Sequence, residues 1–268
     1  MGGLPFGGDD WTMEENLAKI AEGGFDGAEF LMEDKAHRDL MVPLCDKYNL
    51  KRSNIVFPWT AAEFADDIAA AKDGGASHIN LQPIPITRTV AEPIPYLVHC
   101  MDMAADADFE LFFETHRDRT TTDMYYTLDL IGAVPELQLC GDLSHFLVGR
   151  EFAGPPISET NQKYMEQIVE RCGAFYGRVA SREQIQVSIT FPHDRVWFDI
   201  FAGWWKHGFR AFGKRAGEDS TLRFVVDVGP PTYAIQGADG QELSDRWEEA
   251  LMIKNQVREI WSRLEAEG

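Results

Sequence analysis

The sequence predicts an α/β fold, a (β/α)8 barrel of the TIM type, with residues 1–268 forming a single domain. Short apolar runs rich in β-branched or aromatic residues alternate with helical stretches, a pattern typical of parallel strands joined by helices. Eight such runs can be counted, which favours a closed barrel over an open sheet. No linker, repeat or low-complexity stretch divides the chain, and its length suits one barrel.

Several of the expected strands are apolar on both faces, as strands covered by helices should be. In chain order, the eight expected strands are residues 4–6, 27–31, 52–57, 78–82, 110–114, 138–142, 174–179 and 223–228.

The helices between these strands carry start and stop signals. Thr12 followed by Glu15 predicts a capping box, and the helix that it opens should end at Gly23 and Gly24. A second helix is expected over residues 61–72, before another glycine pair. Near the end of the chain, apolar residues from Trp247 to Leu264 recur at helical spacing, which predicts a helix packed on the barrel by one face.

The composition narrows the class of partner. The formal charge is −19 and the isoelectric point is near 4.7, so no basic surface is expected to neutralise nucleic acid or an anionic membrane. Charged residues interrupt every long apolar stretch, and the four cysteines show no CxxC spacing. We therefore expect a cytoplasmic protein with reduced thiols and a small-molecule substrate. The sequence leaves open whether the protein forms a homo-oligomer.

Polar residues gather where the expected strands end. In FFETHRDR an apolar strand ends in Glu114, followed by His116, Arg117 and Arg119, and in LQLCGDLSHF a strand ends in Asp142, with His145 three residues later. The carboxyl ends of barrel strands meet at one rim, where catalytic loops gather. Two carboxylates in such a mouth need a cation or a shared proton, which favours a metal site. The alternative for each acid is a cap on the following helix or turn.

Two further motifs add charges to this rim. FYGRVAS contains Arg178, and RFVVDVGPPTYAI contains Asp227 ahead of a Gly-Pro-Pro turn. The planar fork of arginine suits a phosphate or a carboxylate, so Arg178 could bind an anionic substrate or pair with a neighbouring acid. Asp227 brings a third carboxylate, from the last strand.

These motifs resemble the sugar-phosphate isomerase/epimerase family of the xylose isomerase-like TIM barrel superfamily. Relatives carry ETHR, ADFSHW, HARVG and PELGPPPY, where this chain reads ETHR at 114–117, GDLSHF at 141–146, YGRVA at 176–180 and VDVGPPTY at 226–233. The spacing covers about half of the chain. The weaker WTMEENLAKIAEGGFDGAEF opening and INLQP at 79–83 extend the resemblance towards the whole length.

The resemblance implies one divalent metal, held by a Glu, an Asp, a His and a second Glu from four successive strands. By motif, Glu114 matches the first Glu and Asp142 the Asp, while His145 and Arg178 match substrate-contacting residues. Two positions depart, because Tyr176 replaces the ligand histidine and Asp227 replaces the last glutamate. The implied metal set is thus Glu114, Asp142 and Asp227, with Mn, Mg, Co or Zn as the ion.

The departures change the expected chemistry. Neutral tyrosine is a poor ligand for these ions, and aspartate reaches one methylene less far than glutamate. Either His145 completes the site together with the carboxylates, or Tyr176 acts directly by donating a hydrogen bond to a developing oxyanion.

The leading functional hypothesis is an isomerase or epimerase acting on a sugar, a sugar phosphate or a related polyhydroxylated keto compound, by proton abstraction next to the carbonyl. The catalytic candidates are Glu114, Asp227, Tyr176 and His145, and the substrate-binding candidates are Arg178, His116, Arg117, Trp59 and Gln82.

Two alternatives stay open. The same base and oxyanion stabiliser would serve a lyase or dehydratase, or an enzyme that cleaves C-glycosides. The two ligand substitutions could also mark a barrel that has lost catalysis and serves as a binding or partner subunit. The zinc-dependent DNA-repair branch of the superfamily is disfavoured, because this chain lacks a histidine-rich cluster and a basic face.

Overall fold

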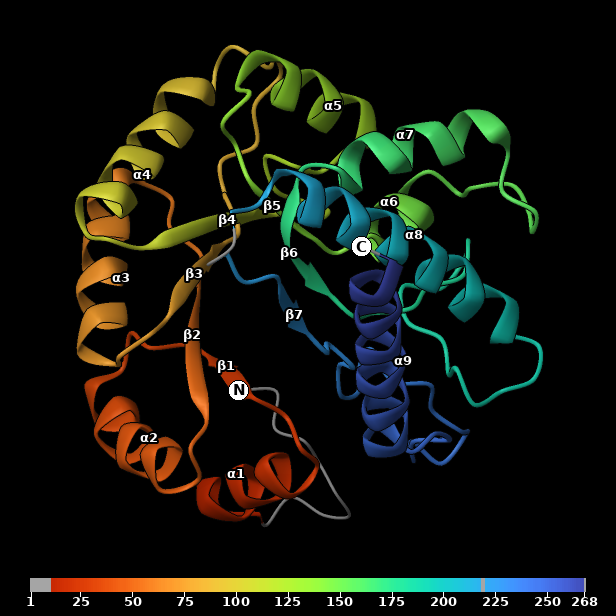
Figure 1. Cartoon of the computed structure of the whole chain (residues 1–268), viewed down its shortest axis with the longest axis horizontal. Helices are drawn as coiled ribbons and strands as arrows, with labels where there is room; N and C mark the ends of the chain where they lie inside the picture. The colour runs from red at the N-terminus through yellow and green to blue at the C-terminus, as the bar shows by residue number, and fades with distance from the viewer. Residues whose placement is uncertain (1–10, 218–219, 268) are drawn as a thin grey trace. The chain divides into compact units, whose positions relative to one another are not determined.

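The computed structural model describes residues 11–217 and 220–267. The chain divides into two compact units. The first unit comprises Met1–Glu114 and Asp118–Thr120, and the second comprises Thr115–Arg117 and Thr121–Gly268. Within each unit, parallel strands alternate with helices (Figure 1). That all 268 residues form a single domain stays a prediction.

Among its described residues, the first unit contains four strands that pair in chain order. Its strands are β1 (Gly27–Phe30), β2 (Lys51–Val56), β3 (His78–Leu81) and β4 (Glu110–Glu114), and its helices are α1 (Met13–Glu22), α2 (Lys35–Lys47), α3 (Ala61–Asp73) and α4 (Ile94–Asp106). Adjacent strands are parallel throughout. In the register of β3 with β4, Leu81 lies opposite Phe113. The residues that follow this pair, Gln82 and Glu114, are therefore brought to the same end of the sheet.

The helix signals read from the sequence are present in the first unit. Thr12 and Glu15 form a complete capping box at the start of α1, and Gly24, just after that helix, has a φ of 71°. Glycine adopts this left-handed conformation without the steric cost that a Cβ brings. Beneath α1 and α2 lies an apolar core that includes Leu17, Phe30 and Met41. The capping and the apolar face together place α1 against β1.

The second unit contains three parallel strands and five helices among its described residues. The strands are β5 (Leu139–Gly141), β6 (Cys172–Tyr176) and β7 (Arg223–Val225), and the helices are α5 (Met124–Ala133), α6 (Ser144–Gly149), α7 (Glu159–Val169), α8 (Arg195–Arg215) and α9 (Arg246–Glu267). The long helix α8 packs on β6, α7 and α9. Figure 1 shows α8 and α9 side by side near the C-terminus.

Aromatic side chains form the core between α8 and β7. Trp205 is fully buried, and its ring meets Phe224 of β7 edge-on with 5.3 Å between the ring centroids. Phe201 and Phe198 contact the same indole at 6.0 and 6.2 Å. Edge-to-face packing of this kind adds to the stability that comes from burying large apolar surfaces.

Seven of the eight expected strands are confirmed at their positions, and the expected strand at residues 4–6 lies outside the described residues. The expected C-terminal helix is also confirmed, as α9. Val257 of the expected stripe is buried, but Trp247 and Leu251 are only half-buried, and Ala250, Ile253 and Ile260 complete the buried side instead. The prediction placed Trp247 and Trp261 on the buried side of the helix because their indole rings are large and apolar.

Two further features concern the helices and the cysteines of the described residues. Within residues 11–217 and 220–267, every helix is too short or too polar to cross a lipid bilayer. Cys45, Cys100, Cys140 and Cys172 are all unpaired thiols, and all four are buried. That these thiols are reduced in the cell stays a prediction.

Replacing Trp205 by Ala should lower the free energy of unfolding by about 3–5 kcal/mol, because it opens a cavity in the aromatic core. Urea denaturation followed by far-UV circular dichroism measures the loss. Trp59→Ala is the matched control, since Trp59 is 65% exposed and its removal should change stability by no more than about 0.5 kcal/mol. Equal effects of the two substitutions would contradict the assigned core.

Candidate active site

The second unit contains a buried arginine that binds two aspartates. Arg178 lies just beyond β6, and its Nε donates to Asp142 Oδ2 at 3.2 Å. Its Nη2 donates to Asp227 Oδ2, and its Nη1 donates to Gln186 Oε1 at 3.2 Å. The guanidinium also lies over the Tyr233 ring, 4.5 Å from the centroid. Asp142, Arg178 and Asp227, which are far apart in the sequence, are thus brought together.

Asp142 is fully buried and remains ionised. It follows β5, where its Oδ1 accepts hydrogen bonds from the Ser144 backbone N–H at 3.1 Å and from the Ser144 hydroxyl. Burial alone would raise the pKa of Asp142, but the interactions with His145, Arg178 and Ser144 outweigh it and hold the pKa well below its usual range. The carboxylate therefore carries its negative charge through the physiological pH range.

Asp227 has a different environment, although it shares the same arginine. Its side chain is 30% exposed. Burial raises the pKa of Asp227, the negative charge of Asp142 adds to the rise, and contact with Arg178 opposes it, so that the pKa lies above its usual value. Two acids on one cation thus have pKa values shifted in opposite directions, an arrangement that suits acid–base chemistry.

Gln186 fixes the turn that follows Asp227. Its amide nitrogen donates to the Gly229 carbonyl at 2.9 Å, and its amide oxygen accepts from the Gly229 N–H at 2.7 Å. The same oxygen accepts from Arg178, so one buried amide ties the Gly-Pro-Pro turn to the arginine.

His145 is a buried imidazole with one ring nitrogen that has no hydrogen-bond partner. It lies in the short helix α6 and is 1% exposed, and its Nδ1 makes no hydrogen bond. Its Nε2 lies 3.4 Å from Asp142 Oδ2, and its ring lies 3.9 Å from that of His116, measured between centroids. A buried polar atom without a partner costs free energy, so an imidazole in this state marks a place for a ligand.

In the first unit, Glu114 is 2% exposed at the end of β4. Its Oε2 accepts a hydrogen bond of 2.8 Å from the Gln82 amide, and Gln82 Oε1 accepts one of 3.0 Å from Arg119 Nε. A carboxylate, an amide and a guanidinium therefore form a continuous hydrogen-bonded series.

His116 lies beside His145 in the second unit, and each imidazole offers one nitrogen as a ligand atom. Imidazole nitrogens are ligands that suit Zn²⁺, Mn²⁺ or Co²⁺. The two histidines thus offer nitrogen ligands although Tyr176 occupies the position of the family's ligand histidine.

The remaining predicted residues differ in exposure. Tyr176 is buried at the end of β6, while Arg117 is exposed in the segment after β4. Trp59 is exposed in the loop between β2 and α3. Their roles in catalysis or substrate binding stay predictions.

Sequence reasoning missed three residues of this cluster. Tyr233 lies within the motif that resembles the family, so its place beside Arg178 could have been found there. Ser144 follows Asp142 by two residues and could have been recognised as a local hydrogen-bond donor. Gln186 lies in the irregular segment after β6, where no periodicity points to a buried amide.

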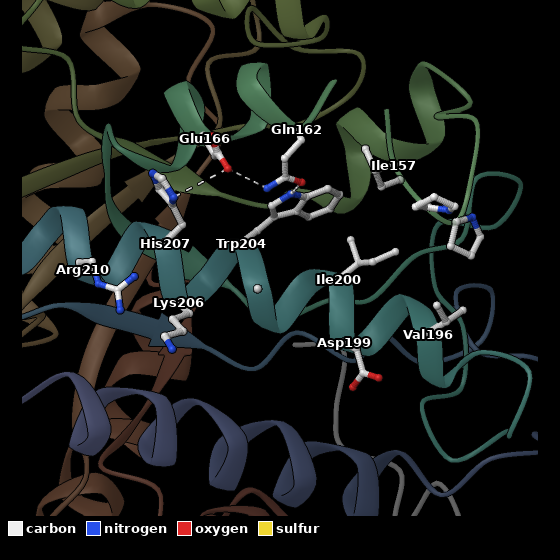
Figure 2. A pocket seen from close by; sticks show the side chains of 13 residues that line it. Ile157, Gln162, Glu166, Val196, Asp199, Ile200, Trp204, Lys206, His207 and Arg210 are labelled. Carbon is white, nitrogen blue, oxygen red and sulfur yellow. Dashed lines mark hydrogen bonds and ion pairs between the residues drawn. The ribbon is translucent and has the colours of Figure 1, made fainter. Parts of the chain in front are cut away.

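A separate groove of about 800 Å³ lies in the second unit between α7 and α8 (Figure 2). Several of its polar side chains contact one another: Trp204 Nε1 donates to Gln162 at 2.8 Å, Gln162 donates to Glu166 at 3.0 Å, and His207 lies 4.0 Å from the Glu166 carboxylate. None of the residues that line it belongs to the Arg178 cluster. We therefore place the candidate active site at Arg178 and His145, not in this groove.

Comparison with solved structures identifies the fold. A xylose isomerase-like TIM barrel protein from Mycobacterium smegmatis, in complex with magnesium, has a TM-score of 0.61 at 12% identity, and the match covers 97% of this chain and 94% of that one. D-psicose 3-epimerase with D-tagatose from Clostridium cellulolyticum H10 has a TM-score of 0.58 at 13% identity, over 94% of each chain.

A probable 3-DHS dehydratase from Bacillus anthracis is also similar, with a TM-score of 0.55 at 12% identity over 93% of each chain. No family model and no curated protein matches the sequence. The chain has the fold of xylose isomerase-like TIM barrels, which confirms the predicted fold class, and the similar structures include enzymes.

Replacing Arg178 by Leu should lower the free energy of unfolding by about 3–5 kcal/mol, because it leaves Asp142 and Asp227 without their shared cation. Adding Asp142→Asn and Asp227→Asn to this variant should restore part of the loss. Arg182→Leu removes the same charge from a residue whose side chain is 38% exposed, and serves as the control in urea denaturation. If Arg178→Leu destabilises no more than this control, the assigned ion pairs are wrong.

Proposed function

We propose that this protein is an isomerase or epimerase that acts on a sugar, a sugar phosphate or a related polyhydroxylated keto compound by proton abstraction next to the carbonyl. The observation that carries the proposal is the buried imidazole of His145, whose Nε2 lies 3.4 Å from Asp142 Oδ2 and whose ring lies beside that of His116. The epimerases among the structures of the same fold support it.

A divalent metal belongs to this proposal, with His116 and His145 as its nitrogen ligands and Glu114, which the ETHR motif predicts as a ligand, as its carboxylate. The histidines fit the metal because their rings lie side by side and Nδ1 of the buried His145 makes no hydrogen bond. We prefer this set to Asp142 and Asp227, because Arg178 already supplies the positive charge that those carboxylates need. When bound, the metal would polarise the substrate carbonyl and stabilise the charge that develops on its oxygen.

Glu114 is the proposed base. The Gln82 amide already holds its carboxylate in place. The Glu114 side chain therefore loses little conformational entropy when a substrate binds. Asp227 is the proposed acid, because its raised pKa favours a transferable proton and its partial exposure allows exchange with solvent.

Arg178 is proposed to fix the anionic or hydroxyl end of the substrate. An arginine has five N–H donors, and three of its nitrogens each donate one hydrogen bond to Asp142, Gln186 and Asp227. Two donors on the terminal nitrogens are left for a substrate oxygen. Because the guanidinium is held by buried partners, its direction is set before the substrate arrives.

A dehydratase is the second candidate, and the similarity to the probable dehydratase from Bacillus anthracis favours it. The same base and oxyanion stabiliser would expel water from a substrate with a hydroxyl group β to the carbanion. Mass spectrometry of the product separates the two, because isomerisation leaves the mass unchanged whereas dehydration removes one water.

Replacing Glu114 by Gln should reduce turnover by about 10²–10⁴-fold, because it removes the general base. The assay incubates ketoses and ketose phosphates in D₂O and follows deuterium incorporation next to the carbonyl by NMR. Glu110→Gln, at the exposed beginning of the same strand, is the matched control and should retain full activity. Undiminished exchange in Glu114→Gln would refute the assigned base.

Protein purified without chelator should contain a divalent metal in stoichiometric amount, and dialysis against EDTA should remove both metal and activity. Replacing His145 by Ala should weaken Mn²⁺ binding, measured by calorimetric titration, because one ligand is lost. His193→Ala is the control, since His193 is exposed and belongs to the same unit. A metal-free wild type with no Mn²⁺ affinity would favour a binding subunit over an enzyme.

A further inference from the structure

We infer that Gln186 is a positioning residue through which the turn at Gly229 holds the Arg178 guanidinium from two directions, at one edge and over one face. The inference rests on the proposed function, in which Arg178 binds the anionic or hydroxyl end of the substrate. It assigns to one buried amide the task of keeping the direction of this arginine constant. All the residues involved belong to the second unit.

Gln186 pairs with the backbone of Gly229 through both ends of its amide. Its Nε2 donates to the Gly229 carbonyl at 2.9 Å, and its Oε1 accepts from the Gly229 N–H at 2.7 Å. The side chain is 6% exposed, and hydrogen bonds at buried positions are stronger than those in water. The backbone brings this amide beside Arg178, because the Val187 N–H donates to the Val179 carbonyl at 3.0 Å.

The edge of the guanidinium is held by the same amide. Arg178 Nη1 donates to Gln186 Oε1 at 3.2 Å, so this oxygen accepts one hydrogen bond from the arginine and one from the turn. If the amide turned by half a revolution, its nitrogen would face two donors, the guanidinium and the Gly229 N–H. A single orientation of the amide therefore satisfies all its partners.

The face of the guanidinium is covered by Tyr233, which follows the turn. The centroid of its ring lies 4.5 Å from Arg178 Cζ, a distance at which a cation is attracted to an aromatic ring. Tyr233 is itself packed on the turn: its N–H donates to the Pro230 carbonyl at 2.7 Å, and a Cβ added at Gly229 would lie only 2.8 Å from the Tyr233 Cβ. Glycine allows this close approach, so the turn fixes the ring as well as the amide.

Removing the Gln186 amide should release Arg178 without removing either of its acids. Nη1 would lose its acceptor, and the Gly229 N–H and carbonyl would lose their partner, which loosens the turn that carries Tyr233. The two aspartates would still hold Nε and Nη2. The expected defect is therefore a loss of direction in Arg178 and not a loss of its ion pairs.

Side-chain NMR of the full-length protein labelled with ¹⁵N-arginine tests this restraint without a substrate. In the wild type, rotation about the Arg178 Cζ–Nη1 bond should be slow and give separate resonances for the two Nη1 protons. Arg178→Lys identifies these resonances by their loss. Gln186→Met keeps the length of the side chain and removes the amide, so the two resonances should merge. Gln184→Met makes the same change at an exposed residue of the same segment and should keep the wild-type pattern.

Gln186→Glu is the second variant. It keeps an oxygen that accepts from Arg178 and from the Gly229 N–H, so the Nη1 resonances should stay separate. Circular dichroism and melting temperature show that each variant is folded. The positioning role is overturned by a single averaged signal in the wild type, by separate resonances in Gln186→Met, or by merged resonances in Gln186→Glu, and the last outcome decides if Gln186→Met does not fold.

Deuterium exchange into ketoses and ketose phosphates supplies the functional readout. Gln186→Met should lower kcat/KM by about 10²-fold, mainly through KM, because a displaced Arg178 binds the substrate in the wrong geometry. Gln184→Met should keep wild-type values, and a loss in Gln186→Met confined to kcat would contradict a role through Arg178. Wild-type protein that incorporates no deuterium overturns the proposed function, whereas the NMR comparison still decides whether Gln186 positions Arg178.

Discussion

The ion pairs of Arg178 with Asp142 and Asp227 are the interaction on which the candidate site depends. Two carboxylates from different strand ends repel each other, and at a buried position that repulsion costs more than it does in water. Arg178 offsets it with one cation, and Gln186 ties the same guanidinium to the turn beyond Asp227. Stability and site geometry therefore have a common origin in the second unit.

This arrangement determines where a metal is expected. In the pattern that the sequence resembles, the Asp and the last acid of the motif are ligands, but here both are bound by arginine. A ring nitrogen without a hydrogen-bond partner belongs instead to His145, at its Nδ1, and His116 lies beside it. In that pattern a ligand histidine stands where this chain has Tyr176, and the proposed nitrogen ligands come from His116 and His145 instead, with Glu114 common to both proposed ligand sets.

The sequence predicted much of this structure because its signals are local. Strand and helix positions follow from hydrophobic patterns and capping residues, and the polar strand ends at Glu114 and Asp142 follow from the alternation of strands and helices. The strand boundaries shifted where pairing decides them: β6 begins at Cys172 because that residue pairs with Leu139. The contacts of Gln186 and Arg119 span irregular segments, where neither periodicity nor spacing indicates which side chains meet. The pairing of Arg178 with acids was one of two interpretations that the sequence alone left open.

The most direct test of this account is a crystal structure of the protein soaked in Mn²⁺, with the ion located by its anomalous scattering. We predict one peak, bound by the Glu114 carboxylate and by nitrogens of His116 and His145, while Arg178 keeps its contacts to Asp142 and Asp227. A peak ligated by Asp142 and Asp227, with Arg178 displaced, would contradict it, and so would a crystal with no peak near His145.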